Sequence, residues 1–308
     1  MTRAVVFAYH NVGVRCLRVL LAQGVDVALV VSHQDNPRET IWFDSVAATA
    51  ARHGIPVETP EDPNTQEYLA RLAALRPDFL FSFYYRLMLK PELLALAPRG
   101  AYNMHGSLLP KYRGRVPVNW AVIHGETETG ATLHRMVAKP DAGDIVDRQA
   151  VPILPDDTAK EVFDKVTLAA EICLHRVLPA LLAGTAPHEP QDLARGAYFG
   201  GRKPEDGRID WSRPAAEIHN LIRAVAPPYP GAFCDLAGGR LAVLASQPLP
   251  PEPPPLPGPG LLLRHDRLLA QCGDGRLLWL IALESCGRPV AAAHWPACFG
   301  SLPLLLTT

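Results

Sequence analysis

The sequence predicts an α/β protein with a mostly parallel sheet, followed by a small β domain. Up to about residue 203, short β-branched or aromatic runs alternate with stretches of helical apolar spacing, which is typical of a parallel sheet with crossover helices. After that point, short apolar runs are separated by Pro and Gly, which favours short strands joined by turns. A length of 308 residues also favours two domains, so we expect one at residues 1–203 and one at residues 204–308.

The elements of the first domain follow from local patterns. Strands are expected at residues 4–9, 25–32, 78–83, 101–105 and 132–137, and helices at residues 14–23, 41–53 and 116–123. A longer helix should begin at Thr158, because Thr158 and Glu161 have capping-box spacing, and should end at Gly184. Its expected apolar stripe consists of Val162, Val166, Ala169, Cys173 and Val177.

The second domain contains a proline-rich segment at residues 248–260. So many prolines make regular structure there unfavourable, and a stiff loop between two strands is the favoured interpretation. A docking ligand for a proline-recognising partner is the alternative.

Composition limits the function classes. The 30 basic and 31 acidic residues nearly cancel, so the chain has no overall field for gathering nucleic acid or an anionic membrane, and neither partner is expected. The six cysteines are dispersed without a CxxC pair, which favours reduced, structural thiols over disulfides or zinc ligands. The N-terminal apolar run is too short for a signal peptide and no other segment approaches a charge-free membrane span, so we expect a cytoplasmic protein.

Nucleotide-hydrolysing and dinucleotide-dependent enzymes are disfavoured. The turn after the first expected strand contains Gly13 but lacks the other glycines of a Gly-x-Gly-x-x-Gly fingerprint. No Walker-type Gly-Lys-Ser/Thr sequence occurs in the chain.

Three polar residues form a candidate catalytic group. Asn103 and His105 lie two residues apart at the end of an expected strand, so alternation directs both side chains to the same face. Asp141 lies in a polar turn between two apolar runs, where it could meet the histidine. A carboxylate beside an imidazole favours the imidazolium and fixes the ring, while an amide can donate to an oxyanion. The group therefore suits attack of an amine on a carbonyl.

The same group has no obvious attacking side chain. Ser107 is the nearest hydroxyl in the sequence, and a serine two residues past a strand end is more often a cap or turn residue than a nucleophile. Direct transfer without a covalent acyl-enzyme is the simpler scheme.

A longer motif surrounds these residues. Residues 105–110 read HGSLLP, Arg113-Gly114 follows, and Asp141-Ala142-Gly143 comes later. This pattern resembles the signature of the formyltransferases that use 10-formyltetrahydrofolate. The likeness extends over residues 5–10, 81–86, 125–130, 132–136, 223–226 and 230–233, and it thins beyond about residue 241. It implies the formyltransferase fold, with a Rossmann-like sheet and a small C-terminal domain that is β-barrel-like (OB-like).

The resemblance implies roles for individual residues. His105 would be the general acid and base, Asn103 the oxyanion stabiliser and Asp141 the partner of His105. The co-substrate 10-formyltetrahydrofolate, without a metal, would contact Leu87, Met88, Leu89, Arg115, Val137, Ala138, Lys139, Pro140 and Asp141. The side chains at residues 87–89 differ from those of the most similar family members, so only backbone contacts to the pterin carry over there.

Within the family, the chain is most similar to the formyltransferase domains of bifunctional polymyxin-resistance proteins. This implies transfer of a formyl group to the 4-amino group of UDP-4-amino-4-deoxy-L-arabinose, a step in lipid A modification. Those proteins also carry an NAD-dependent decarboxylase half, and only the formyl-transfer step is expected of these 308 residues. For the diphosphate of such an acceptor, the candidate partners are Lys111, Arg113, Arg202 and Lys203, although each could be an ordinary surface charge.

Three alternatives remain open. Methionyl-tRNA formyltransferases share the catalytic residues, but from Pro204 onward this chain has eight arginines and no lysines against nine acidic residues, which is a poor surface for tRNA. The connection at residues 32–40 is short, and residues 132–136 read TLHRM, which resembles the sugar enzymes. A formyltetrahydrofolate hydrolase, with water in place of the amine, and a folate-binding module without catalysis are the other two.

Overall fold

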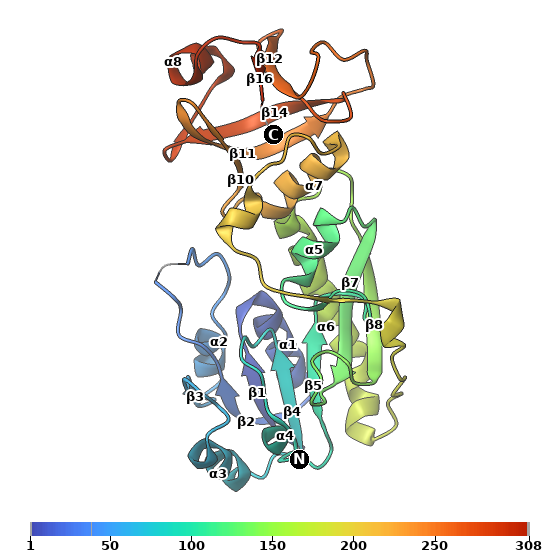
Figure 1. The fold of residues 1–308 in the computed structure, drawn as a ribbon. Coiled ribbons are helices and arrows are strands. Elements are labelled where there is room, and N and C mark those ends of the chain that lie inside the picture. Colours follow the sequence, from blue (N-terminus) through green and yellow to red (C-terminus); the bar gives the residue numbers. More distant parts are fainter. Residues whose placement is uncertain (1, 38, 307–308) are drawn as a thin grey trace. The chain divides into compact units, whose positions relative to one another are not determined.

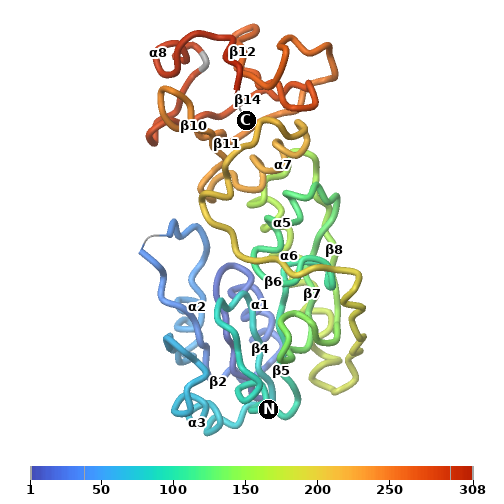
Figure 2. Tube along the Cα trace, viewed as in Figure 1, coloured from blue at the N-terminus to red at the C-terminus, as the bar shows by residue number. Residues whose placement is uncertain are grey.

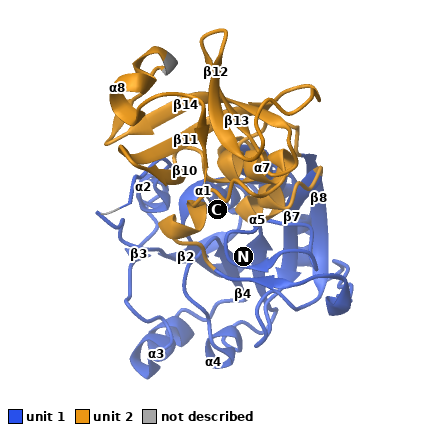
Figure 3. Ribbon diagram, turned by 45° about the horizontal axis from the view of Figure 1, so that its top comes forward, with its two compact units in different colours: residues 1–117, 128–152, 163–200 blue, residues 118–127, 153–162, 201–308 orange. Residues whose placement is uncertain are grey.

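The computed structural model describes residues 2–37 and 39–306, and the chain divides into two compact units (Figure 3). Unit 1 comprises Met1–Pro117, Glu128–Pro152 and Phe163–Gly200. Unit 2 comprises Val118–Thr127, Ile153–Val162 and Gly201–Thr308. The division at residues 203 and 204 stays a prediction, and Arg38 of the 32–40 connection lies outside the described residues.

Unit 1 is built on a seven-stranded sheet with the order β3-β2-β1-β4-β5-β7-β8 (Figure 1). The neighbouring pairs β3–β2, β2–β1, β1–β4 and β4–β5 are parallel. β7 pairs antiparallel with both β5 and β8. The strands are β1 (Arg3–Ala8), β2 (Asp26–Val31), β3 (Val57–Glu58), β4 (Phe79–Phe83), β5 (Ala101–His105), β7 (Glu128–Arg135) and β8 (Ile145–Pro152). The predicted α/β class with a mostly parallel sheet is confirmed.

Helices alternate with the strands up to β7, and α6 follows β8, as the tube in Figure 2 lets the reader follow. They are α1 (His10–Ala22), α2 (Val46–Arg52), α3 (Gln66–Ala74), α4 (Pro91–Leu94), α5 (Pro117–Ile123) and α6 (Ala159–Ala183). The predicted capping box of α6 is present: the Thr158 backbone N–H donates to Glu161 at 2.8 Å, and the Glu161 N–H donates to the Thr158 hydroxyl at 3.3 Å. Gly184, with φ of 75°, follows the last turn.

The core of unit 1 explains why its central strands have continuous apolar sequences. Val5 and Phe7 of β1 and Leu80 of β4 are fully buried, because helices cover both faces of a parallel sheet. They form one cluster with Leu29, Leu72 and Leu93 and other buried residues. This core fixes the carboxyl ends of β4 and β5.

Unit 2 contains an antiparallel sheet with the order β10-β11-β14-β13-β12-β16, and β15 pairs with β14. The strands are β10 (Ala232–Leu236), β11 (Gly239–Pro248), β12 (Gly260–Arg264), β13 (Arg267–Gln271), β14 (Leu277–Ser285), β15 (Arg288–Pro289) and β16 (Leu304–Leu305). The predicted small β domain is confirmed, and residues 249–259 form the predicted loop between two strands. Two helices were not expected there, α7 (Ala215–Val225) and α8 (Trp295–Phe299).

Several expected boundaries are wrong. The helix predicted at residues 41–53 begins only at Val46, because the Ser45 side chain caps it by accepting from the Ala48 N–H. β7 begins at Glu128, earlier than predicted, and pairs with β8, which the prediction lacked.

Two expectations from composition can also be compared with the structure. Cys16, Cys173, Cys234 and Cys272 are buried free thiols, as expected, whereas Cys286 and Cys298 are exposed. By length and composition α6 could cross a membrane, which the sequence analysis had not recognised, although Val162, Val166 and Cys173 of its apolar stripe are fully buried in the fold.

Candidate active site

The antiparallel register between β5 and β7 brings four polar side chains together. Asn103 lies directly opposite His134, and His105 lies directly opposite Thr132. Residues two apart on a strand share a face, and directly opposite residues on antiparallel strands are neighbours on that face. The prediction that Asn103 and His105 point the same way is consistent with their contacts: Asn103 contacts His134, and both His134 and His105 face Asp141.

Asp141 reaches this group from the loop after β7. Its Oδ1 lies 3.6 Å from Nδ1 of His105 and 3.5 Å from Nε2 of His134. Its Oδ2 accepts the Gly114 N–H at 2.8 Å. One carboxylate therefore faces two imidazoles and one backbone donor.

The position of the Asp141 carboxylate depends on backbone that is held from two sides. Asp141 has a left-handed backbone with φ of 49°, which is unfavourable for a residue with a Cβ. Nε2 of Gln191 donates to the carbonyls of Asp141 and Gly143, at 3.1 and 2.6 Å. Gly114 has φ of 101°, and a Cβ there would lie 2.2 Å from the Phe199 carbonyl oxygen, so only glycine can present this N–H.

His105 is buried, and both of its ring nitrogens face acceptors. Nε2 lies 2.8 Å from the Tyr112 carbonyl oxygen, which can only accept, so this nitrogen carries a hydrogen. Nδ1 faces Asp141. The arrangement leaves Nδ1 as the nitrogen that can gain or lose a proton beside the carboxylate.

His134 is a functional candidate that the sequence analysis missed. Its ring is buried, Nδ1 lies 3.0 Å from the Arg135 carbonyl oxygen, and Nε2 lies 3.1 Å from Nδ2 of Asn103. The sequence offered only one signal, the position of His134 in the TLHRM run, because the strand register that places it opposite Asn103 cannot be read from spacing.

The charge state of Asp141 follows from these neighbours. Burial of this carboxyl raises its pKa, but the charges of His105 and His134 when these rings are protonated, the hydrogen bond that a protonated His134 donates, and the Gly114 N–H together outweigh burial. The pKa of Asp141 is therefore held well below its usual range. The side chain is ionised at neutral pH although only 14% of its surface is exposed.

The hydroxyl groups near the cluster hold the chain in place. The Ser107 hydroxyl donates to the Lys111 carbonyl at 2.6 Å, and the Thr132 hydroxyl donates to the Ser107 carbonyl at 2.6 Å while accepting the Leu109 N–H at 3.1 Å. Ser107 is thus a turn residue, as expected, and both hydroxyls fix the segment that carries His105.

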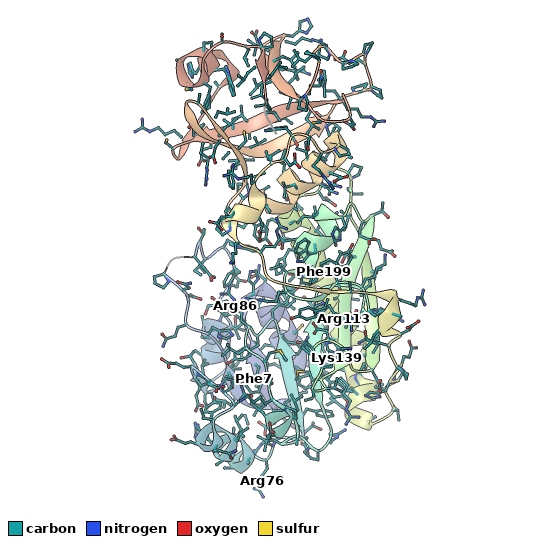
Figure 4. The ribbon with its side chains drawn as sticks, viewed as in Figure 1. Phe7, Arg76, Arg86, Arg113, Lys139 and Phe199 are labelled. Atoms are coloured by element: carbon teal, nitrogen blue, oxygen red, sulfur yellow. The ribbon has the colours of Figure 1, made fainter. Side chains whose placement is uncertain are left out.

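The predicted folate residues other than Arg115 lie on two loops. Leu87, Met88 and Val137 are large apolar side chains that are 39%, 57% and 42% exposed, whereas Leu89 is buried in the core of unit 1. Ala138, Lys139, Pro140 and Asp141 continue the loop after β7. In Figure 4, Lys139 and Arg113 are labelled over the β5 and β7 part of the sheet and Arg86 toward β1 and β2. Exposed apolar side chains next to polar backbone can contact a flat aromatic ligand.

The four cations considered for a diphosphate are divided between the two units. Arg113 is only 7% exposed and donates to the Gly196 carbonyl at 3.3 Å, so it is a buried structural cation and not a surface charge. The Arg202 guanidinium lies 4.8 Å from the Trp120 ring centre and donates to the Asp206 carbonyl at 2.7 Å. Lys111 and Arg113 belong to unit 1, and Arg202 and Lys203 to unit 2. Arg115, the predicted folate contact, donates its N–H to the Phe199 carbonyl at 2.9 Å.

The fold and the cluster define an α/β protein with a group of histidine, asparagine and aspartate side chains on an antiparallel strand pair at the side of a parallel sheet. Among residues 2–37 and 39–306, no group of three or more His, Cys, Asp or Glu side chains could hold a metal ion. A sequence model of the formyl transferase family matches residues 13–178, and a model of the formyl transferase C-terminal domain matches residues 202–298. The chain belongs to the formyl transferase family and is a formyltransferase.

Solved structures with this fold include two formyltransferases and one larger protein. An N-formyltransferase from Helicobacter canadensis, in complex with folinic acid and dTDP-3-aminofucose, has a TM-score of 0.69 at 20% identity, over 91% of this chain and 99% of that chain. A 4-N formyltransferase from Francisella tularensis has a TM-score of 0.63 at 17% identity, over 77% and 94%. HypX from Aquifex aeolicus, in complex with tetrahydrofolic acid, has a TM-score of 0.63 at 18% identity, over 96% of this chain and 46% of that chain.

Proposed function

We propose that this protein transfers the formyl group of 10-formyltetrahydrofolate to the amino group of a nucleotide-linked sugar, namely the 4-amino group of UDP-4-amino-4-deoxy-L-arabinose. The observation that carries the proposal is the cluster of Asn103, His105, His134 and Asp141 in unit 1, linked by three contacts of 3.1 to 3.6 Å. It combines an amide donor, an imidazole that can exchange a proton and an ionised carboxylate, which are the groups that amine formylation needs.

The reaction would proceed by direct transfer. The lone pair of the amine attacks the formyl carbon, and the oxyanion that forms accepts from the Asn103 amide. Nδ1 of His105 takes a proton from the attacking nitrogen and gives it to N10 of the folate, whose bond to the formyl carbon then breaks. Asp141 stabilises the imidazolium that exists between these two steps. The products are the formamide of the sugar and tetrahydrofolate.

The folate is best accommodated against the loops that carry Leu87, Met88 and Val137. These exposed apolar side chains offer contact surface for the pterin and benzoyl rings, which are flat and aromatic. Arg86 begins one of these loops and is held by two 2.9 Å hydrogen bonds to Glu39, so the loop has a fixed starting point. The Met88 carbonyl accepts from the Asn64 side chain, so the pterin would bond to other backbone groups of this loop.

The choice of a sugar acceptor rests on charge and on the structural neighbours. The excess of acidic residues over basic ones from Pro204 onward disfavours tRNA. The N-formyltransferase from Helicobacter canadensis holds both folinic acid and dTDP-3-aminofucose, and the enzyme from Francisella tularensis is a 4-N formyltransferase. The 4-amino position and the arabinose acceptor come from the motif resemblance.

An acceptor comparison tests this proposal. Purified protein is given 10-formyltetrahydrofolate with UDP-4-amino-4-deoxy-L-arabinose, dTDP-3-aminofucose or methionyl-tRNA, and formylated products are measured by mass spectrometry. We expect kcat/KM to be highest for the UDP-sugar and negligible for the tRNA. Higher kcat/KM with methionyl-tRNA would refute the sugar assignment, and a preference for the dTDP-sugar would correct the acceptor.

The role of His105 is tested in the same assay. His105→Ala should lower kcat by about 10²- to 10⁴-fold, the usual worth of a general acid and base, while folate still binds. The matched control is His53→Ala. His53 is an exposed histidine far from His105 in the sequence, so this substitution should leave kcat unchanged. Unchanged turnover in His105→Ala would contradict the mechanism.

A further inference from the structure

The contact between Asn103 and His134 carries an inference about how the oxyanion donor is oriented. An asparagine amide has a donor end and an acceptor end, and only the donor end can stabilise an oxyanion. Nδ2 of Asn103 lies 3.1 Å from Nε2 of His134, and that same Nε2 lies 3.5 Å from Oδ1 of Asp141. The end of the amide that faces His134 therefore lies in the cluster with Asp141 and His105.

The hydrogen on the His134 ring decides which end of the amide this is. Nδ1 of His134 faces the Arg135 carbonyl, which only accepts, so Nδ1 carries a hydrogen in either charge state. In the neutral ring Nε2 then has a free lone pair, which accepts one N–H of Asn103. When Nε2 is protonated, two donors oppose each other, and the amide is favourable only with its oxygen toward His134.

We propose that His134 is a positioning residue for formyl transfer: its neutral ring holds the NH2 group of Asn103 in the cluster, and protonation of Nε2 turns the amide so that its oxygen replaces that donor. With His134 neutral, one N–H of Asn103 is bonded to the ring and the second is available to the oxyanion. With His134 protonated, the amide oxygen faces the cluster and repels the oxyanion. This inference rests on the proposed function in one respect only, namely that the Asn103 amide donates to the oxyanion of formyl transfer.

Two titratable groups face the His134 ring. The Asp141 carboxylate lies 3.5 Å from Nε2. The centre of the His105 ring lies 6.5 Å from that of His134, close enough for the two rings to interact. Both histidines must be unprotonated for the first step, His105 as the base and His134 as the acceptor for Asn103. Activity should therefore fall on acidification with more than one ionisation.

Two substitutions separate positioning from packing. In His134→Gln, the amide oxygen of glutamine reaches about as far from the backbone as Nε2, and it accepts from Asn103 at every pH. This variant should keep kcat within a few-fold of the wild type. In His134→Leu the acceptor is lost, and kcat should fall on the order of ten- to a hundredfold, part of the loss seen when an oxyanion donor is removed, with little change in KM for the folate. Thermal melting of both variants establishes that they fold.

The pH dependence of kcat gives the decisive readout. The acid limb of the wild type should be steeper than one ionisation allows, and that of His134→Gln should follow a single ionisation. Equal kcat in the Gln and Leu variants, or the same acid limb in the wild type and His134→Gln, would overturn the proposal.

A measurement without substrate keeps this test separate from the proposed function. The side-chain amide signals of Asn103 are followed by NMR in the ligand-free protein and assigned by their absence in Asn103→Asp. We expect these signals to shift on acidification in the wild type together with the His134 ring nitrogens, and to stay constant in His134→Gln. Constant signals in the wild type would contradict the inference even if formyl transfer is observed, and shifting signals would support it even if the acceptor is misassigned.

Discussion

Asp141 combines a left-handed backbone, two imidazole neighbours and a backbone donor in one residue. A charged carboxylate is costly to bury, and these partners offset that cost. Because the pKa of Asp141 is lowered in the folded protein, its ionised form stabilises the fold at pH values above the unfolded pKa of about 3.9, and this stability is lost as the pH falls below it.

The ionised state of Asp141 can be tested with Asp141→Asn. This variant should lose activity and should unfold at lower urea concentration than the wild type near pH 6. The difference in the free energy of unfolding should shrink as the pH falls from about 4 toward 2, because the wild type loses its ion pairs there. Urea titrations at several pH values measure it, and the exposed carboxyl in Glu67→Gln serves as a control. A difference that stays constant down to pH 2 would contradict this account of Asp141.

At the residue scale, the sequence predicts some members of the site and not others. Asn103 and His105 could be predicted because strand alternation is a local rule, and Asp141 because it belongs to a recognisable motif. His134 could not, since its role depends on the register between two strands. The burial of the Arg113 side chain could not be predicted for a related reason. Its guanidinium contacts the segment at Gly196, which is distant in the sequence.

At the scale of elements, the loop after β7 sets the position of the carboxylate. Gly143 is essential to its path, since a Cβ there would lie 2.0 Å from the Arg135 carbonyl oxygen. Backbone cannot yield as a flexible side chain does, so the loop would have to move, and with it Asp141 and the carbonyls held by Gln191.

We therefore predict that Gly143→Ala lowers kcat more than tenfold, because small displacements of catalytic groups carry large rate costs. Gly200→Ala is the matched control: a Cβ there meets no atom within 4 Å. Steady-state kinetics and melting temperatures of the two variants measure the effect. Equal activity of both variants would show that the loop path does not control the site.

The elements differ in how well the sequence determines them. α6 was predicted at both ends because its capping box and its terminal glycine are local signals. The helix expected from residue 41 starts later because Asp44 donates its N–H to Asn11 and the Trp42 ring packs against His10, contacts that no local pattern shows. α3 was missed although Thr65 caps it through the Tyr68 N–H, a signal that the sequence contains.

At the scale of the whole molecule, the distribution of apolar runs, prolines and glycines along the sequence was sufficient to predict the fold class. Continuous apolar strands separated by helices predicted the parallel sheet, and Pro- and Gly-punctuated runs predicted the β domain of unit 2. The order of strands and the antiparallel β7–β8 pair could not be predicted, because they depend on long-range pairing. α7 was missed because it is one amphipathic helix in a segment dominated by turn residues.

The central claim is direct formyl transfer from folate to an aminosugar, and the coupling of its two products tests it most directly. Tetrahydrofolate and formylated sugar are measured together, with 10-formyltetrahydrofolate present and UDP-4-amino-4-deoxy-L-arabinose either added or omitted. We predict equal amounts of the two products with the acceptor, and almost no tetrahydrofolate or formate without it. Rapid release of formate in the absence of acceptor would show that water is the natural acceptor and would contradict the account.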